Sequence, residues 1–345
     1  SNDWLAWNTL GAIVLGIALL AVFVVQQRRT SHPTIDISLF ANRHFSAGSV
    51  AIAVTFFSLT GATFYLAYFL QAVRGYSALA AGVALIAVAA AVMIAAPMSA
   101  RLSRRFGPRI VTGAGMTIFG VNFCLYVFTT QSMPQWIIEV MMAGMGAGMG
   151  LTMSPATNAI MSAVPRAKAG AGSAVNSTVR QVASALGVAV LGSIVAVVFR
   201  NHLGAGTPAE TAARLDRPAA VVSQLPANLH ISSLVTADTS QSIGNALEFV
   251  NHSAQVLQQR AAATHASPQQ VAAAQAAGRQ VLGQFVAESN ASFMSAMHIA
   301  SVFAGLAALL GALIAFAFLP SRREFEQSSA IVEPAVDETP EAVLA

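Results

Sequence analysis

Seven long apolar stretches, separated by polar segments, dominate the pattern of the chain. Each holds about the 20 mostly apolar residues that a helix needs to cross the hydrocarbon layer of a membrane. The pattern therefore predicts an all-α polytopic membrane protein with seven transmembrane helices. The stretches are Trp4–Val25, Phe45–Leu70, Ala78–Ala100, Ile110–Thr129, Pro134–Met161, Gly172–Phe199 and Ser292–Leu319.

The sixth stretch contains a charged residue well inside its apolar length. Arg180 lies about eight residues from the start of the stretch, which is roughly 12 Å along a helix. A charge at this depth is costly, so it needs partners and usually has a function. Two roles stay open for Arg180: a structural clamp on neighbouring helices, and contact with a cavity where it shifts the pKa of a carboxylate. It belongs to a polar stripe at helical spacing, formed by Ser173, Asn176, Ser177, Arg180, Gln181 and Ser184.

Two polar segments interrupt the apolar pattern. Residues 201–290 are rich in Ala, Gln, Ser and His and are too polar to cross a membrane, so they predict an extracytoplasmic insertion with two or three helices. Residues 31–44 alternate apolar and polar positions. This alternation is typical of a short amphipathic segment on the cytoplasmic membrane face, and an ordinary connector is the alternative.

The basic residues are concentrated in alternate loops. Loops rich in Lys and Arg face the cytoplasm in most membrane proteins. We therefore expect a plasma-membrane protein with Ser1 outside and the C-terminal tail inside. The loops on the predicted cytoplasmic side hold Arg28, Arg29, Arg43, Arg101, Arg104, Arg105, Arg109, Arg166, Lys168, Arg322 and Arg323.

The composition excludes several classes of function. Only 9% of the residues are charged, against about 25% in soluble domains. The net charge of +4 does not indicate nucleic-acid binding, because the basic residues punctuate apolar runs and form no basic surface. The single cysteine, Cys124, and the spacing of the histidines do not favour a metal site, and no span carries a nucleophile and base pair. We expect no enzyme, no metal and no cofactor.

The loop PMSARLSRRFGPRIVTGAG, between the third and fourth stretches, resembles the Gly-x-Leu-Ala-Asp-Arg-x-Gly-Arg-Lys signature of the major facilitator superfamily. Leu102 matches the signature, as do three of the residues that we take as candidates for a gating loop. Ala100, Arg104 and Pro108 depart from it, so the loop resembles the weaker copy in the second half of these transporters. The gating-loop candidates are Arg101, Arg105, Gly107 and Arg109.

Two further motifs resemble the fourteen-span drug/proton antiporter branch of that family. They are PTIDISLF with a following Phe45, and the run NSTVRQ with LGVAVLG around Arg180. The resemblance implies export of lipophilic or cationic compounds by alternating access, driven by a proton gradient. It also implies that the chain is the C-terminal half, partnered in the bilayer by an N-terminal six-helix half of the same protein. The absence of an initial Met agrees with this expectation of a longer protein.

The resemblance implies a domain organisation as well. The last six spans would form a C-terminal bundle of two three-helix repeats. The expected parts are a linker transmembrane helix (1–30), a cytoplasmic amphipathic connector (31–44), five bundle helices (45–200), an extracytoplasmic insertion (201–290), the last transmembrane helix (291–320) and a disordered cytoplasmic tail (321–345).

Aromatic, methionine and amide side chains in the spans are candidates for substrate contact. An aromatic face could stack on a bulky substrate, and Met side chains adapt to varied apolar ligands. The alternative for the aromatic and Met residues is helix packing or an aromatic belt, and for Asn122 it is a hydrogen bond between helices. The candidates, beside Asn176, Arg180 and Gln181, are Phe57, Phe64, Tyr65, Tyr68, Asn122, Met145, Met149 and Asn158.

Glu139 is the one carboxylate within a predicted span. A proton carrier must titrate, so Glu139 is the candidate for proton coupling, with His298 second. An exposed interfacial glutamate is the alternative for Glu139. For the whole chain, the alternative to a transporter is a seven-span receptor or sensor whose insertion binds a ligand outside the cell.

Overall fold

The computed structural model describes residues 7–29, 37–165, 168–203, 248, 256 and 268–325. These residues are helical or lie in turns between helices, and six helical segments are long and apolar enough to cross a membrane. The prediction of an all-α polytopic membrane protein is therefore confirmed. The long helices are α1 (Trp7–Arg29), α2 (Arg43–Tyr68), α4 (Ile86–Phe106), α5 (Pro108–Leu125), α6 (Gln135–Ser162), α7 (Ala169–Leu203) and α11 (Pro268–Phe318).

Short elements complete several of the spans. The seven-residue helix α3 (Ala78–Ala84) precedes α4, and the two together form one apolar segment. Local hydrogen bonds fix where helices start: Asn42 Oδ1 accepts from the amides at the start of α2, and Ser77 Oγ accepts from the Ala80 amide. The remaining elements are η1 (Ile37–Ala41), η2 (Phe69–Val73) and η3 (Tyr126–Phe128).

The last helix is longer than the sequence pattern predicts. The apolar stretch begins at Ser292, whereas α11 begins at Pro268 and runs for 51 residues. The reason is that PQQVAAAQAAGRQVLGQFV consists largely of good helix formers, so the helix continues where the apolar composition ends. The boundary expected at residue 290 is therefore not a helix boundary. Most of the rest of the predicted insertion lies outside the described residues.

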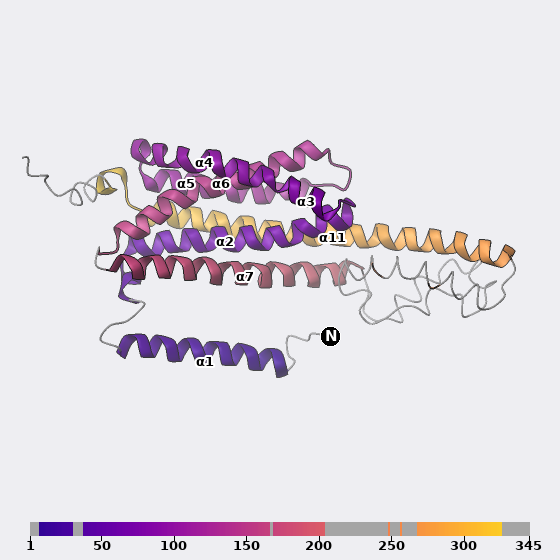
Figure 1. The fold of residues 1–345 in the computed structure, drawn as a ribbon, viewed down its shortest axis with the longest axis horizontal. Helices are drawn as coiled ribbons and strands as arrows, with labels where there is room; N and C mark the ends of the chain where they lie inside the picture. The colour runs from indigo at the N-terminus through magenta and orange to yellow at the C-terminus, as the bar shows by residue number, and fades with distance from the viewer. Residues whose placement is uncertain are drawn as a thin grey trace, which may run out of the picture.

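The membrane-spanning helices form two layers (Figure 1). One layer contains α4, α5 and α6, and the other contains α2, α7 and α11. Contacts of α11 with α5 and of α2 with α6 join the layers. Helix α1 is drawn apart from this bundle, so its role as the first transmembrane span stays a prediction.

The packing follows an internal two-fold correspondence. Helix α4 packs on α6 as α7 packs on α2, and α5 packs on α6 as α11 packs on α2. Exchanging α2 with α6, α4 with α7 and α5 with α11 converts one set of contacts into the other. Two three-helix repeats, α2 to α5 and α6 to α11, produce this pattern. The first helix of each repeat packs in the layer of the other repeat: α6 packs with α4 and α5, and α2 packs with α7 and α11. The two repeats are therefore interleaved.

Glycines bring the helices of each layer close together. Gly146 and Gly150 of α6 face α4, where an added Cβ would meet the Val88 carbonyl oxygen and the Ala95 side chain. Gly148 faces α5. The two GxxxG pairs in this helix therefore serve helix packing, as small residues do in membrane bundles.

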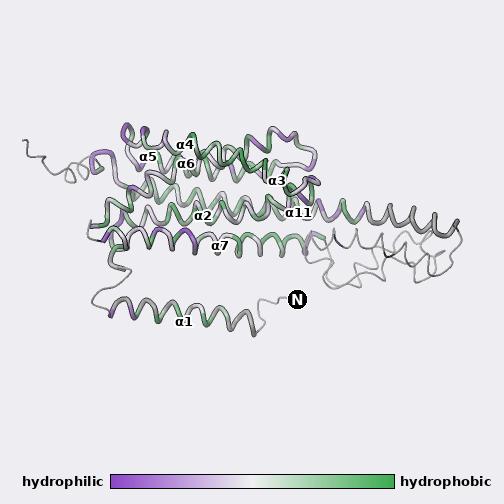
Figure 2. Tube along the Cα trace, in the orientation of Figure 1, coloured by the Kyte–Doolittle hydropathy of each residue, from purple (hydrophilic) through white to green (hydrophobic). Residues whose placement is uncertain are grey.

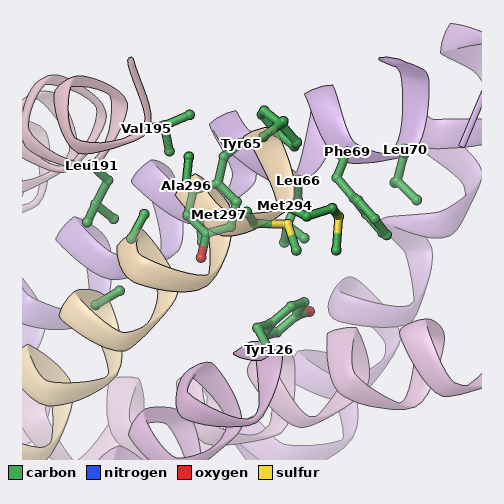
Figure 3. Close-up of a cluster of buried hydrophobic side chains, with 14 of the residues drawn as sticks. Tyr65, Leu66, Phe69, Leu70, Tyr126, Leu191, Val195, Met294, Ala296 and Met297 are labelled. Atoms are coloured by element: carbon green, nitrogen blue, oxygen red, sulfur yellow. The ribbon is translucent and has the colours of Figure 1, made fainter. Parts of the chain in front are cut away.

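Large side chains fill the space between the layers. Tyr65, Phe69 and Tyr126 are fully buried together with Met294 and Met297 of α11 (Figure 3). The Tyr65 hydroxyl lies 2.8 Å from the Ser301 hydroxyl, so the tyrosine ties α2 to α11 inside the core.

A polar network closes one end of the bundle, where α2 begins and α11 ends. We call it the basic end, because it carries Arg43, Arg101, Arg104, Arg105, Arg109, Arg322 and Arg323. Arg43 Nη2 lies 2.9 Å from Glu324 Oε1, and His44 Nδ1 donates to the Phe318 carbonyl at 3.0 Å. The Ser321 amide donates to Glu324 Oε2 at 2.8 Å. These contacts hold the start of α2 against the end of α11.

The network at the basic end is expected to weaken in acid. The amide and hydroxyl of Ser321, with a smaller effect of Arg43, lower the pKa of the Glu324 carboxyl. The resulting stabilisation is complete above the unfolded-state pKa, roughly 4.3, and is lost as the pH falls through the lower folded-state value. The check is the distance between spin labels at Ala41 and Arg323. This distance should lengthen when the pH falls below the folded-state pKa of Glu324. Glu324→Gln should show the long distance already at neutral pH. Equal distances in both proteins at neutral pH would contradict this account.

Candidate functional site

Three helices meet at Arg180, which α7 carries about one third of the way from its start. Arg180 Nη2 donates a long hydrogen bond of 3.5 Å to Thr157 Oγ1 of α6. The guanidinium carbon lies 5.3 Å from the centre of the Phe56 ring of α2, which is cation–π distance. Nearby, Thr60 Oγ1 donates to Ser184 Oγ at 3.1 Å. The polar stripe of α7 therefore faces α2 and α6 over part of its width.

Polar atoms at this site are incompletely satisfied. Arg180 Nε is buried without a hydrogen-bond partner in the described part of the chain, and the same is true of Asn176 Oδ1. Asn176 is 8% exposed. The Arg180 Nε–H can therefore still donate one hydrogen bond, and Asn176 Oδ1 can still accept one. Unpaired buried polar groups are costly, so partners for both atoms would stabilise the site.

The remainder of the polar stripe lies at the surface of the bundle. Gln181, Ser173 and Ser177 are exposed on α7, and Asn158 is exposed on α6 beside Thr157. Figure 2 shows hydrophilic positions over the first half of α7 and hydrophobic positions over the second half. The structure thus places Asn158, Asn176, Arg180 and Gln181 in one region, which we call the Arg180 site together with Phe56 and Thr157.

The predicted aromatic face of α2 divides into two parts. Phe57 lies at the contact of α2 with α7 and α11, with its ring centre 6.4 Å from that of Phe303. Phe64 and Tyr68 are 40% and 39% exposed and pack edge to face with their centres 5.3 Å apart. Phe57 is half-buried at its contact, whereas Phe64 and Tyr68 are exposed. Tyr65, which lies beside this face in the sequence pattern, is fully buried in the core.

The methionine stripe also serves the core. Met145 is fully buried and Met149 packs against the same cluster, so the soft surface expected there is internal packing. Asn122 points at α6, where its amide nitrogen contacts Gly144. Its Oδ1 has no hydrogen-bond partner among the described residues, so the expected hydrogen bond between helices is not formed through that oxygen.

The titratable candidates lie far from the Arg180 site. Glu139 is exposed near the start of α6 and accepts from Gln135 Nε2 at 3.1 Å. It precedes Thr157 by eighteen residues on the same helix, which is about 27 Å. His298 Nε2 lies 3.0 Å from the Thr129 carbonyl oxygen, to which it donates, at the end of the bundle opposite the basic end. The structure therefore does not bring Glu139 or His298 together with Arg180.

The gating-loop candidates lie at the basic end. Gly107 has φ 88°, a left-handed conformation that favours glycine, and an added Cβ would lie 2.8 Å from the Arg322 nitrogen. The Arg105 carbonyl accepts from Arg322 Nη1 at 3.1 Å. Arg101 is exposed and Arg109 is half-buried. The tight turn between α4 and α5 is thus packed against the segment that follows α11.

Two residues of the Arg180 site are missing from the sequence prediction. Phe56 does not stand out in the sequence because Phe57, Gly61 and Tyr68 fit a single helix face, and Thr157 resembles any hydroxyl in a span. A usable signal exists in the spacing of Phe56 and Thr60. They are four residues apart, so they lie on one face of α2, adjacent to the face that we predicted.

Residues 2–188 match the family model described as Major Facilitator Superfamily. The match covers more than half of the chain and includes the Arg180 site. The chain belongs to the Major Facilitator Superfamily. Membership of this family favours transport over the receptor alternative.

The chain is also similar in sequence to individual proteins of known name. The chain is 31% identical over 211 residues to the multidrug resistance protein Stp of Mycobacterium tuberculosis. The aligned part covers 59% of this chain and 39% of Stp. It is 30% identical to the multidrug efflux pump LfrA of Mycolicibacterium smegmatis, covering 66% of the chain and 46% of LfrA. It is 31% identical to the methyl viologen resistance protein SmvA of Salmonella typhimurium, covering 60% and 42%. The matched part of the chain thus spans less than half the length of these relatives.

Proposed function

We propose that the bundle α2 to α11 is one half of a proton-coupled multidrug exporter that works by alternating access. The observation that carries the proposal is the Arg180 site, a polar region with unused hydrogen-bonding capacity on the side of an otherwise apolar bundle. In a transporter of this family such a region faces the cavity between two bundles. The names of the relatives, a multidrug efflux pump and a methyl viologen resistance protein, support the substrate class that we propose, lipophilic or cationic compounds.

The second half of the cavity would come from a six-helix bundle preceding this one in the full-length protein. The matches cover 39% to 46% of the relatives' lengths, which leaves room in those proteins for such a bundle. The chain itself would lie in the plasma membrane with its basic end in the cytoplasm, because loops rich in Arg and Lys are retained there. The proton gradient would supply the energy, without a cofactor.

Within the proposed path, each part of the chain has a role. Phe56 and Arg180 would contact substrate from α2 and α7, with Asn158, Asn176 and Gln181 lining the polar side. Phe64 and Tyr68 would continue the path along α2 toward the other end. The loop at Gly107, packed on Arg322, would move with the basic end as the cavity opens and closes. Glu139, if it carries protons, would do so at the outer mouth of the path.

The test is transport by the full-length protein in proteoliposomes. A proton gradient, acidic inside the vesicles, should drive accumulation of ethidium, methyl viologen or tetraphenylphosphonium, and each substrate should release protons that a pH dye detects. An uncoupler should stop both movements, and vesicles without protein serve as the control. Substrate movement that is unaffected by collapse of the gradient would contradict proton coupling. No movement of any of the three cations would contradict the proposed substrate class.

A further inference from the structure

Arg180 has more hydrogen-bond donors than its surroundings use. The guanidinium has five N–H groups. One of them reaches Thr157 Oγ1 at the long distance of 3.5 Å, and the guanidinium carbon lies 5.3 Å from the centre of the Phe56 ring. The Nε–H is buried and unpartnered in the described part of the chain. A half-buried guanidinium inside the apolar length of a span, with its Nε–H buried and unpartnered, lacks a counter-charge among the described residues.

No acidic residue that the structure describes forms an ion pair with Arg180, and those of the bundle are placed elsewhere. Glu324 is paired with Arg43 at the basic end. Glu139 lies about 27 Å along α6 from the Thr157 contact. Glu288 precedes the end of α11 at the basic end by thirty residues, about 45 Å. The counter-charge therefore comes from outside the described helices.

We propose that Arg180 is the binding site for a carboxylate in the transport path. This inference rests on the proposed function, because it needs the path to pass the Arg180 site. The planar guanidinium matches the two oxygens of a carboxylate with two parallel N–H donors, and the unused Nε–H is one of the pair needed. Phe56 beside the guanidinium favours a carboxylate joined to a flat aromatic body, and the exposed Gln181 and Asn158 offer further polar contacts.

The carboxylate has two sources, and they imply different substrates. A carboxylate on the substrate makes the exporter one for acidic or zwitterionic aromatic compounds. A carboxylate on a facing helix of the same protein neutralises Arg180, and a cationic substrate is then no longer repelled. In both cases the same N–H groups of Arg180 donate to a carboxylate. The two measurements below distinguish where that carboxylate comes from.

The first measurement is binding of 2-naphthoate and 2-naphthamide to the purified full-length protein. The two probes share shape and aromatic surface and differ in charge. If the substrate supplies the carboxylate, naphthoate should bind at least about tenfold tighter than naphthamide, since charge-assisted hydrogen bonds are the stronger ones. Arg180→Gln should remove this preference and Arg180→Lys should retain part of it. Arg200→Gln, which removes an exposed arginine from the same helix, should leave it unchanged.

The second measurement is the pH dependence of transport. If the protein supplies the carboxylate, the naphthoate preference should be absent. Arg180→Gln should then raise the pH of half-maximal transport, because loss of the guanidinium raises the pKa of the carboxylate beside it. No naphthoate preference together with an unshifted pH profile overturns the inference. The binding ratio is readable even if the protein transports none of the cations tested above, so failure of the proposed function is distinguishable from failure of this inference.

Discussion

Replacing Gly187 by alanine is expected to disrupt the contact between α7 and α2 and to destabilise the whole bundle. A Cβ at residue 187 would overlap the backbone carbonyl oxygen of Phe57, and a Cβ at Gly61 would lie 2.6 Å from the Gly187 carbonyl oxygen. Both obstacles are backbone atoms of helices, so neither can rotate away as a side chain would. Overpacking of this kind typically costs about 1–3 kcal/mol, here with the addition of lost contacts along the α2–α7 interface.

The measurement is thermal unfolding of the detergent-solubilised protein, together with the monodisperse fraction in size-exclusion chromatography. Gly187→Ala should lower the midpoint by about 5 °C or more and reduce the monodisperse fraction. Gly192→Ala is the matched control, because it lies on the same helix and its added Cβ would approach only the Phe64 ring, at 3.4 Å. Equal midpoints for the two variants would mean that the α2–α7 packing described above is wrong.

Replacing Arg180 by alanine is expected to slow transport strongly while leaving the protein inserted and folded. Among the residues that the structure describes, the guanidinium makes one long hydrogen bond and one ring contact, so its removal takes little from the packing. Its unused donors instead point to a partner that arrives during transport. Loss of charge-assisted hydrogen bonds to that partner corresponds to about 1.5–3 kcal/mol, or a fall in rate of roughly 10- to 150-fold.

The measurement compares initial efflux rates at equal amounts of inserted protein. Arg200→Ala should transport at the wild-type rate, because Arg200 is exposed near the far end of the same helix. Unfolding midpoints of Arg180→Ala and wild type should agree within a few degrees. Unchanged efflux by a well-inserted Arg180→Ala protein would return Arg180 to a purely structural role, and a lowered midpoint with reduced insertion would identify it as a clamp between helices.

The positions of the helices can be predicted from the sequence because a helix in lipid forms whichever helices pack against it. A run of about 20 apolar residues must satisfy its own backbone hydrogen bonds, and the helix does so locally. The same holds for the polar stripe around Arg180, which helical spacing places on one side of α7. The apolar stretch from Ser292 marks only part of α11, because hydropathy indicates where a helix meets lipid, whereas the Ala- and Gln-rich run from Pro268 continues the helix without being apolar enough to cross.

Composition and spacing along the chain are enough to predict a protein of membrane-spanning helices with one charge inside an apolar stretch. Three features need the packed structure: the two repeats interleave, Tyr65 and Met145 belong to the core, and Phe56 and Thr157 contact Arg180. These facts depend on which face of each helix meets which neighbour. In lipid, apolar faces of equal hydrophobicity compete for that contact, and small residues such as Gly61 and Gly187 decide it by allowing close approach.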